Sequence, residues 1–192
     1  MACDLVVVGS SAGGLSALSV VLSGLPSEGF PPVVIAQHQS ATTTGEGLAE
    51  LLQKACALDV RVAHDKDELL PNNVFVGPPD YHVLVERGSL ALSVDEHVMF
   101  SRPSIDVLFE SAAANYGDRV AGVVLTGAND DGARGLAAIR ARGGIAVVQE
   151  PATAEAATMP ARAVELARPH QVLPLDEIAP FLVRISTSGV RS

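Results

Sequence analysis

The sequence predicts an α/β protein: a doubly wound, mostly parallel open sheet with helices on both faces and one inserted antiparallel hairpin. Two observations predict this fold class. Short, continuous apolar runs, typical of parallel strands buried on both faces, alternate with stretches in which apolar residues recur at helical spacing. The first run also ends in a glycine-rich turn that opens a helix, as a βαβ unit begins. We expect about six or seven strands in a Rossmann-like, three-layer αβα arrangement.

The first part of the chain alternates between strand and helix. Asp4–Val8 is a β-rich run that ends at Gly9, and Gly13–Leu25 carries its apolar residues on one helical face. Crossover helices between such strands favour a parallel sheet. The alternation continues with a strand at Val33–Gln37, a helix at Glu46–Ala57 and a strand at Val60–Ala63.

The middle of the chain departs from this alternation. Val74–Val76, His82–Glu86 and Leu90–Val94 are short apolar runs that follow one another without a helix between them. Turn residues at Gly77–Asp80 separate the first two runs, and Arg87–Ser89 separates the last two. We therefore expect the last two runs to form an antiparallel hairpin inserted on the α/β scaffold.

The remainder returns to alternating elements. Pro103–Asn115 reads as a helix with a proline near its start, which suits the first helical turn. The other predicted elements are strands at Val120–Thr126, Ile145–Gln149, Pro160–Leu166 and Val172–Pro174, and helices at Ala133–Arg142 and Asp176–Ile185. Because no repeat, low-complexity tract or linker-like shift in composition interrupts the pattern, we expect a single domain spanning residues 1–192.

The composition excludes several classes of protein. The chain has 192 residues, 48% of them hydrophobic, so it can bury a sizeable core and is not intrinsically disordered. Its apolar runs stop well below the ~20 residues that a membrane-spanning helix needs, so we expect no membrane insertion. The 13 Lys and Arg residues against 22 Asp and Glu residues give a net charge of −9, which argues against nucleic acid as a partner.

The N-terminus and the cysteines predict a cytoplasmic protein. Met1–Asp4 brings an acid where a signal peptide would have a basic region. Two cysteines, Cys3 and Cys56, are too few for a disulfide framework and fit a reducing compartment. No His-Glu-x-x-His sequence and no paired cysteine spacing occurs, so the sequence predicts no metal and no cofactor.

The turn after the first predicted strand has the spacing of a nucleophile elbow. Gly9–Gly14 contains the pattern G-x-S-x-G centred on Ser11. A serine at the tip of a sharp strand-to-helix turn needs small neighbours, because the backbone there is strained. The N-terminal N–H groups of the helix that follows would also stabilise a developing oxyanion.

Two other interpretations of this turn remain open. A glycine-rich first turn also cradles phosphate in dinucleotide-binding folds, and Ser10 or Ser11 could simply cap the helix. The phosphate interpretation is the weaker one, because the glycines at 9, 13 and 14 do not match G-x-G-x-x-G and no Gly-Lys-Ser/Thr follows. The end of the second strand, where ribose recognition requires an acid, holds His38 instead.

A histidine and an acid are predicted at the same edge of the sheet. His38 ends a buried strand, and ligands and catalytic groups of open α/β sheets gather outside the carboxyl ends of the strands. Asp130 and Asp131 follow another buried strand, where they either cap the next helix or orient the His38 ring. We interpret the other histidines as structural: His64, His82, His97 and His170.

The order of these residues along the chain is serine, histidine, acid. An α/β-hydrolase has the order serine, acid, histidine, so a standard member of that fold is not expected. Arg102 either holds an acidic substrate or pairs with a neighbouring carboxylate, and we favour the ion pair.

Several stretches of the sequence resemble the catalytic domains of bacterial chemotaxis receptor methylesterases (CheB-type protein-glutamate methylesterases). The matching stretches occur in the family order and cover the chain from residue 4 to about residue 185. They are Val7–Gly14, Ala36–His38, Gly77–His82, Arg102–Phe109, Val124–Gly127, Asp131–Ala133 and Met159–Pro160.

This resemblance implies a function and a set of roles. It implies Ser11 as nucleophile, His38 as general base and Asp131 as the acid that orients it, with backbone N–H groups at Ala12 and Ala128 as oxyanion donors. The implied reaction is hydrolysis of glutamate methyl esters on the cytoplasmic helices of chemoreceptors, with release of methanol through an acyl-serine intermediate. Some members also deamidate receptor glutamines by the same acyl chemistry.

The sequence also departs from the family pattern. The departures are Ser10, Ala12, Gln39-Ser40-Ala41 after the histidine, Ala128 and Asn129. They leave two alternatives open: a catalytically weakened binding or regulatory module of the same fold, or an esterase or deamidase for another acyl substrate. Because residue 4 already begins the first strand, we expect no receiver domain here, and control by a separate regulatory domain or protein.

Overall fold

A seven-stranded sheet in which every pairing is parallel forms the centre of the computed structural model, which describes residues 3–39 and 45–187. The strand order is β3-β4-β2-β1-β7-β8-β9. The strands are β1 Leu5–Ser10, β2 Val33–Gln37, β3 Asp59–Val62, β4 Asn73–Val76, β7 Val120–Val124, β8 Ile145–Gln149 and β9 Gln171–Leu173. The predicted α/β class and the mostly parallel open sheet are confirmed.

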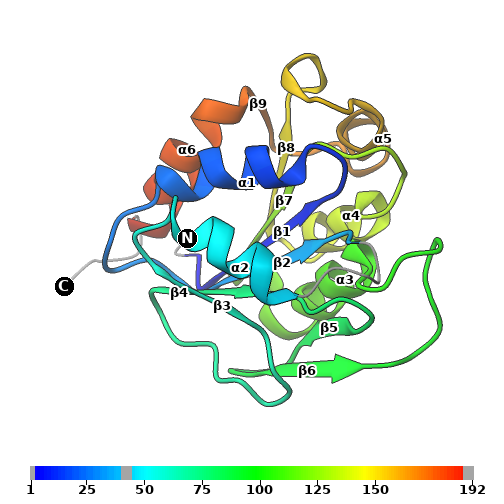
Figure 1. Ribbon diagram of the computed structural model, residues 1–192. Helices are drawn as coiled ribbons and strands as arrows, with labels where there is room; N and C mark the ends of the chain where they lie inside the picture. The colour runs from blue at the N-terminus through cyan, green and yellow to red at the C-terminus, as the bar shows by residue number, and fades with distance from the viewer. Residues whose placement is uncertain (1–2, 40–44, 188–192) are drawn as a thin grey trace.

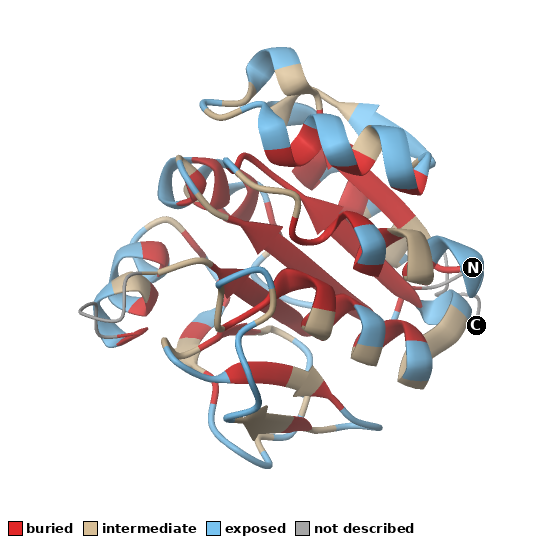
Figure 2. Cartoon of the chain, turned by 90° about the vertical axis from the view of Figure 1, so that its right-hand side faces the viewer, coloured by how far each residue is buried: buried red, intermediate tan, exposed pale blue. Residues whose placement is uncertain are grey.

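Helices cover both faces of this sheet (Figure 1). The helices are α1 Gly14–Ser23, α2 Gly45–Gln53, α3 Ile105–Tyr116, α4 Ala133–Ala141, α5 Thr158–Ala167 and α6 Leu175–Thr187. Alternate residues of β1 point into two separate cores, Val6 and Val8 into that of α1, α2 and α6, and Leu5 and Val7 into that of α3, α4 and α5. The sheet is therefore buried on both sides, as Figure 2 shows.

The predicted antiparallel hairpin is also confirmed. It consists of β5 His82–Val85 and β6 Leu90–Ser93, which pair with each other and not with the main sheet. The hairpin is attached to α3, because the Ser111 hydroxyl accepts a hydrogen bond from the N–H of Val85 at 3.0 Å. Asn115 Nδ2 donates to the carbonyl of the same valine at 2.9 Å.

One predicted strand is wrong: residues 160–166 belong to helix α5. The buried residues of this segment are Met159, Pro160, Ala163 and Ala167, which recur at helical rather than alternating spacing. Pro160 lies in the first turn of the helix, where a missing N–H leaves no hydrogen bond unmade. The other elements lie where the sequence predicts them, with ends that differ by a few residues.

The topology places a switch point at the carboxyl end of β1. This strand lies between β2 and β7. The chain adds β2, β3 and β4 on one side of β1, and it later adds β7, β8 and β9 on the other side. Such a switch point is where open α/β sheets bind their ligands. Among the described helices, none is long and apolar enough to cross a membrane. Residues Met1 and Ala2 lie outside the described part, and the single domain spanning 1–192 stays a prediction.

Candidate active site

The three residues predicted to act together lie at this switch point. Ser11 directly follows β1, His38 directly follows β2, and Asp131 lies in the loop between β7 and α4. The register of the sheet brings the first two tips together, because Ser10 is paired with Gln37 and the N–H of His38 donates to the carbonyl of Ser10 at 3.0 Å.

His38 and Asp131 form a direct contact. Nε2 of His38 lies 2.7 Å from Oδ2 of Asp131, and the aspartate side chain is fully buried. Because an ionised carboxylate only accepts hydrogen bonds, Nε2 carries the proton and Nδ1 is left as the basic nitrogen. In the usual Ser-His-Asp arrangement the acid contacts Nδ1, whereas here it contacts Nε2.

Asp131 is held in its ionised form by the groups around it. Burial by itself raises the pKa of this carboxyl. The hydrogen bonds from the His38 ring and from the N–H groups of Asp106 and Ile105 outweigh that effect, so the pKa lies below its ordinary value. A permanent negative charge next to Nε2 stabilises the imidazolium that forms when Nδ1 takes up a proton.

The same aspartate caps helix α3. Oδ2 of Asp131 accepts from the N–H of Ile105 at 2.7 Å, and Oδ1 accepts from the N–H of Asp106 and from the hydroxyl of Ser104, both at 2.9 Å. These donors stand at the N-terminus of α3, whose N-cap is Ser104. The carboxylate is therefore fixed by four hydrogen bonds, of which only one comes from His38.

Asp106, in turn, accepts hydrogen bonds from the N-terminus of helix α4. Its Oδ1 accepts from the N–H of Gly132 at 3.0 Å and of Gly135 at 2.7 Å, which are groups of the first turn of α4. Oδ2 forms an ion pair with Nε of Arg134 at 3.3 Å. The loop that carries Asp131 thus both accepts hydrogen bonds from α3 and donates one to it.

The interpretation of Asp130 or Asp131 as the cap of the following helix is wrong. The N-cap of α4 is Gly132, and no side chain of its own loop accepts a hydrogen bond there. Asp106 fills this role from a different helix, a contact that no local pattern predicts. Burial, with a further contribution from the neighbouring charge of Asp131, raises the pKa of Asp106.

Two adjacent serines have different environments. Ser10 is fully buried and donates to Oε1 of Gln37 at 2.5 Å. Nε2 of Gln37 donates to the carbonyls of Ser11 at 2.8 Å and of His38 at 2.9 Å, so one side chain fixes both turns. The Ser11 side chain is partly exposed, and within the described part of the chain its hydroxyl has no hydrogen-bond partner. The N-cap of α1 is Gly13, so neither serine caps that helix.

Glycine is required at two positions of this turn. A Cβ on Gly14 would lie 1.9 Å from Oε1 of Gln37, and Gly13 has a φ of +76°. Any side chain at Gly14 would displace the glutamine that joins the Ser11 and His38 turns. The glycine pair thus serves close packing of two chain segments at the site.

The predicted oxyanion donors lie at the entrance of the site. Ala12 and Ala128 are both exposed, and among the described residues the N–H of neither makes a hydrogen bond. The N–H of Ala12 stands at the N-terminus of α1, where the helix dipole favours negative charge. Their role stays a prediction, as does the nucleophilic role of Ser11.

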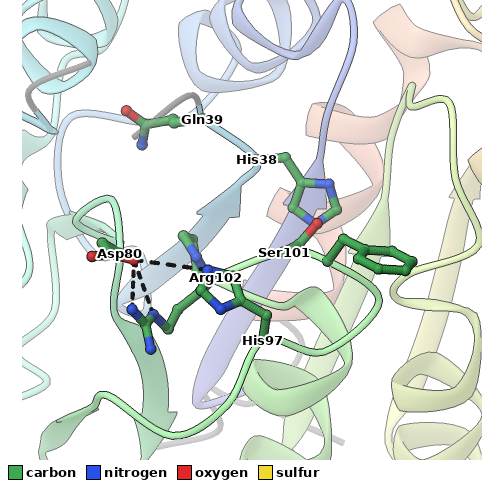
Figure 3. A pocket seen from close by; sticks show the side chains of 8 residues that line it. His38, Gln39, Asp80, His97, Ser101 and Arg102 are labelled. Atoms are coloured by element: carbon green, nitrogen blue, oxygen red, sulfur yellow. Dashed lines mark hydrogen bonds and ion pairs between the residues drawn. The ribbon is translucent and has the colours of Figure 1, made fainter. Parts of the chain in front are cut away.

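A cavity of about 150 Å³ opens beside His38 (Figure 3). It is lined by His38, Gln39, Asp80, His97, Phe100, Ser101, Arg102 and Pro103. Arg102 forms an ion pair with Asp80 at 2.6 Å, which agrees with the favoured interpretation of this arginine. The departures at Ser40 and Ala41 lie outside the described residues.

Sequence patterns did not single out several residues of the site. The patterns predict Gln37 and Asp106 only as parts of a strand and a helix, and Phe100 lies in no predicted element. Ser104 had a usable signal, because a serine before an apolar helical run is a capping pattern. Asn129, whose Nδ2 lies 3.5 Å from Nδ1 of His38, was noted as a departure without a role.

Histidine, cysteine, aspartate and glutamate side chains do not gather in any group of three or more that could hold a metal within residues 3–39 and 45–187. Of the other histidines, His82 is buried and accepts from the N–H of Ser104 at Nδ1 while Nε2 contacts the carbonyl of Glu96, which fits its structural interpretation.

Comparison with known proteins gives a consistent result. The family model "CheB methylesterase" matches residues 6–182. A putative protein-glutamate methylesterase/protein-glutamine glutaminase of Leptospira interrogans is 44% identical over 97% of this chain and 97% of its own length. Protein-glutamate methylesterase/protein-glutamine glutaminase 2 of Pseudomonas aeruginosa is 41% identical over 94% of this chain, which spans 52% of that protein.

Structural comparison agrees. The crystal structure of the Thermotoga maritima CheB methylesterase catalytic domain superposes with a TM-score of 0.90 at 28% identity, covering 96% of this chain and all of that one. The resemblance that the motifs indicated is confirmed in sequence and in structure. The chain belongs to the CheB methylesterase family.

Proposed function

We propose that this protein hydrolyses the 5-methyl esters of glutamate side chains in methyl-accepting chemoreceptors, releasing methanol during chemotactic adaptation. The observation that carries the proposal is the 2.7 Å contact between Nε2 of His38 and Oδ2 of Asp131, at the sheet edge where Ser11 follows β1. Relatives that match nearly the whole chain are named for this activity.

The proposed reaction begins with attack of the Ser11 hydroxyl on the ester carbonyl. Nδ1 of His38 takes the serine proton, and the negative charge of Asp131 stabilises the resulting imidazolium. The N–H groups of Ala12 and Ala128 donate to the oxyanion of the tetrahedral intermediate. His38 then returns its proton to the leaving methoxide, so methanol departs and an acyl-serine remains.

The second half repeats the chemistry with water. His38 accepts a proton from the water as it attacks the acyl-serine. The second intermediate then collapses to a free glutamate, and His38 returns the proton to the departing Ser11 oxygen. A glutamine side chain enters the same sequence with ammonia as the leaving group. This accounts for the second activity in the names of the relatives, and we propose it for this chain as well.

The departures from the family pattern are compatible with this chemistry. The oxyanion donors at positions 12 and 128 are backbone groups, so alanine keeps them. The proposed substrate is a cytoplasmic part of a receptor, which places the protein in the cytoplasm. A separate regulatory domain or protein would control its access to the receptor.

The test is methanol release from a methylated receptor fragment. Ser11→Ala and His38→Ala should each lower the rate by several orders of magnitude, because members of such a triad act as a unit. Ser19→Ala is the matched control, since Ser19 lies half-buried on α1 and its hydroxyl donates only to the carbonyl of Leu15.

A serine-directed fluorophosphonate probe separates the alternatives. Labelling of Ser11 without methanol release would indicate another acyl substrate. Absence of both labelling and turnover, together with receptor binding, would indicate a binding module. Unchanged turnover in Ser11→Ala would contradict the proposed mechanism.

A further inference from the structure

A turn at the edge of the cavity beside His38 carries two exposed apolar side chains. Phe100 is 100% exposed and Met99 is 44% exposed. Val98 and Ser101, which flank them, exchange two backbone hydrogen bonds of 3.2 and 2.9 Å. The turn therefore presents both side chains outward from its tip.

The backbone of this turn is unfavourable for the residues it holds. Met99 has a φ of 49° and Phe100 a φ of 64°, which are left-handed values. A two-residue hairpin turn with positive φ at both central positions prefers Asn-Gly, and bulky residues are uncommon there. Strain of this kind is concentrated at functional sites.

The segment that carries the turn is fixed to the body of the protein. Arg102 donates to the carbonyls of Val94 at 2.9 Å and Asp95 at 3.0 Å, and it pairs with Asp80. Nε2 of the buried His82 lies 3.0 Å from the carbonyl of Glu96. The tip therefore has a defined position, and its side chains are held away from the core.

The two residues of the turn line two different cavities. Phe100 lines the cavity of about 150 Å³ that contains His38. Met99 lines a second cavity of about 220 Å³ together with Asp130 and the exposed Leu166. A macromolecule that approaches His38 through the first cavity therefore meets the side chain of Phe100.

Charge around these two cavities is balanced, although the whole chain has 22 acids and 13 bases. The charged side chains that line the two cavities, histidines aside, are Arg102, Arg134 and Arg162 on one side and Asp80, Asp106 and Asp130 on the other. An acidic partner meets less repulsion here than the net charge of −9 suggests.

We infer that Met99 and Phe100 are the docking contact for the receptor helix that carries the methylated glutamate. The inference rests on the proposed function. A receptor helix that presents its ester beside His38 would bring side chains of its neighbouring turns past Phe100, which lines the same cavity. An exposed aromatic anchor next to a pocket is a typical interface hot spot.

The test uses the double substitution Met99→Asn and Phe100→Gly. Asn-Gly suits the backbone of the turn, so the variant should fold with an unchanged or raised melting temperature. The ratio of kcat/KM for a methylated receptor fragment to kcat/KM for p-nitrophenyl acetate should fall roughly tenfold or more, through KM rather than kcat. Leu70→Ala is the control. Leu70 is 49% exposed and precedes the amino end of β4, whereas the candidate site lies at the carboxyl ends of the strands.

Direct binding separates this inference from the proposed function. In a Ser11→Ala background, the Kd for the receptor fragment, measured by calorimetry, should rise roughly tenfold or more when the turn is changed. Failure of the unmodified protein to release methanol would overturn the proposed function while this measurement still decides the docking contact. An unchanged Kd, no binding of the receptor fragment, or an equal loss on both substrates would overturn the inference.

Discussion

Asp131 accepts hydrogen bonds from a histidine ring and from the N-terminus of a helix at the same time. Its contact with Nε2 of His38 orients the ring, and its contacts with the N–H groups of Ile105 and Asp106 cap α3. The acid of the candidate site is therefore also part of the packing between two helices. A change at this position should affect both catalysis and stability.

Asp131→Asn should lower the rate of methanol release by roughly 10⁴-fold. The amide can donate to Nε2, which moves the ring proton to Nδ1 and removes the basic nitrogen. Loss of the charge should also lower the free energy of unfolding by about 1–3 kcal/mol, because three further donors lose an ionised acceptor. Rates corrected for the folded fraction, taken from urea unfolding, check the first effect, and a rate loss no larger than the unfolded fraction would contradict it.

Reciprocal capping joins α3 and α4 at the scale of the elements. Asp131, in the loop before α4, accepts hydrogen bonds from the N-terminus of α3. Asp106, in the first turn of α3, accepts hydrogen bonds from the N-terminus of α4. This arrangement fixes the loop after β7 without any glycine-rich phosphate motif. It also places two carboxyl groups close together in the interior, and their pKa values move in opposite directions.

Asp106→Asn should change the pH dependence of stability. The pKa of Asp106 is raised on folding, so its favourable contribution is complete below the unfolded value of 3.8 and is lost as the pH rises through the folded value. The amide removes this titration but keeps an oxygen acceptor for Gly132 and Gly135. The variant should therefore gain stability relative to the unmodified protein as the pH rises from about 4.

Urea unfolding between pH 4 and pH 8 measures this difference. Asp118→Asn, at an exposed carboxyl, is the control and should show no comparable trend. The carboxyl of Asp131 acts in the opposite sense, since its lowered pKa gives a contribution that is lost only as the pH falls below 3.8. A difference that shrinks with rising pH would contradict the raised pKa of Asp106.

Much of the fold follows from local patterns, and the exceptions have physical reasons. Buried strands such as Val33–Gln37 are short apolar runs, and this pattern is sufficient to predict them. The predicted strand at Pro160–Leu166 is wrong because a short run with alternating small and charged residues fits strand and helix alike. The helix is settled by tertiary packing, because its buried face lies against α4 and against β7 and β8.

The sequence predicts which residues of the candidate site lie close together, but not how their side chains are oriented. Ser11, His38 and Asp131 follow strands that share one edge of a parallel sheet, so topology alone brings them together. The nitrogen of His38 that faces the acid depends on side-chain orientation across three segments, and no spacing encodes it. The exposure of Phe100 likewise depends on a turn whose residues are unusual for its backbone.

At the scale of the whole molecule, the two cysteines belong to one core. Cys3 and Cys56 are both buried in the core shared by α1, α2 and α6. Burial raises the pKa of the Cys3 thiol to about 11 and raises the pKa of Cys56 as well. Both thiols should therefore be protonated and inaccessible at pH 8.

A thiol reagent such as DTNB should label neither cysteine in the folded protein at pH 8. Labelling of both should follow the urea unfolding curve measured by circular dichroism, because exposure requires the common core to open. Cys3→Ser, which removes one thiol, should halve the final labelling. Rapid labelling of either thiol without urea would contradict a shared, closed core.

The double role of Asp131 has a consequence for how such domains diverge. A descendant that gave up hydrolysis could replace Ser11 at little cost to its fold, since the hydroxyl of that serine has no partner among the described residues. Loss of the aspartate would uncap α3 and leave buried donors unmet. The acid should thus persist even in descendants in which Ser11 has been replaced.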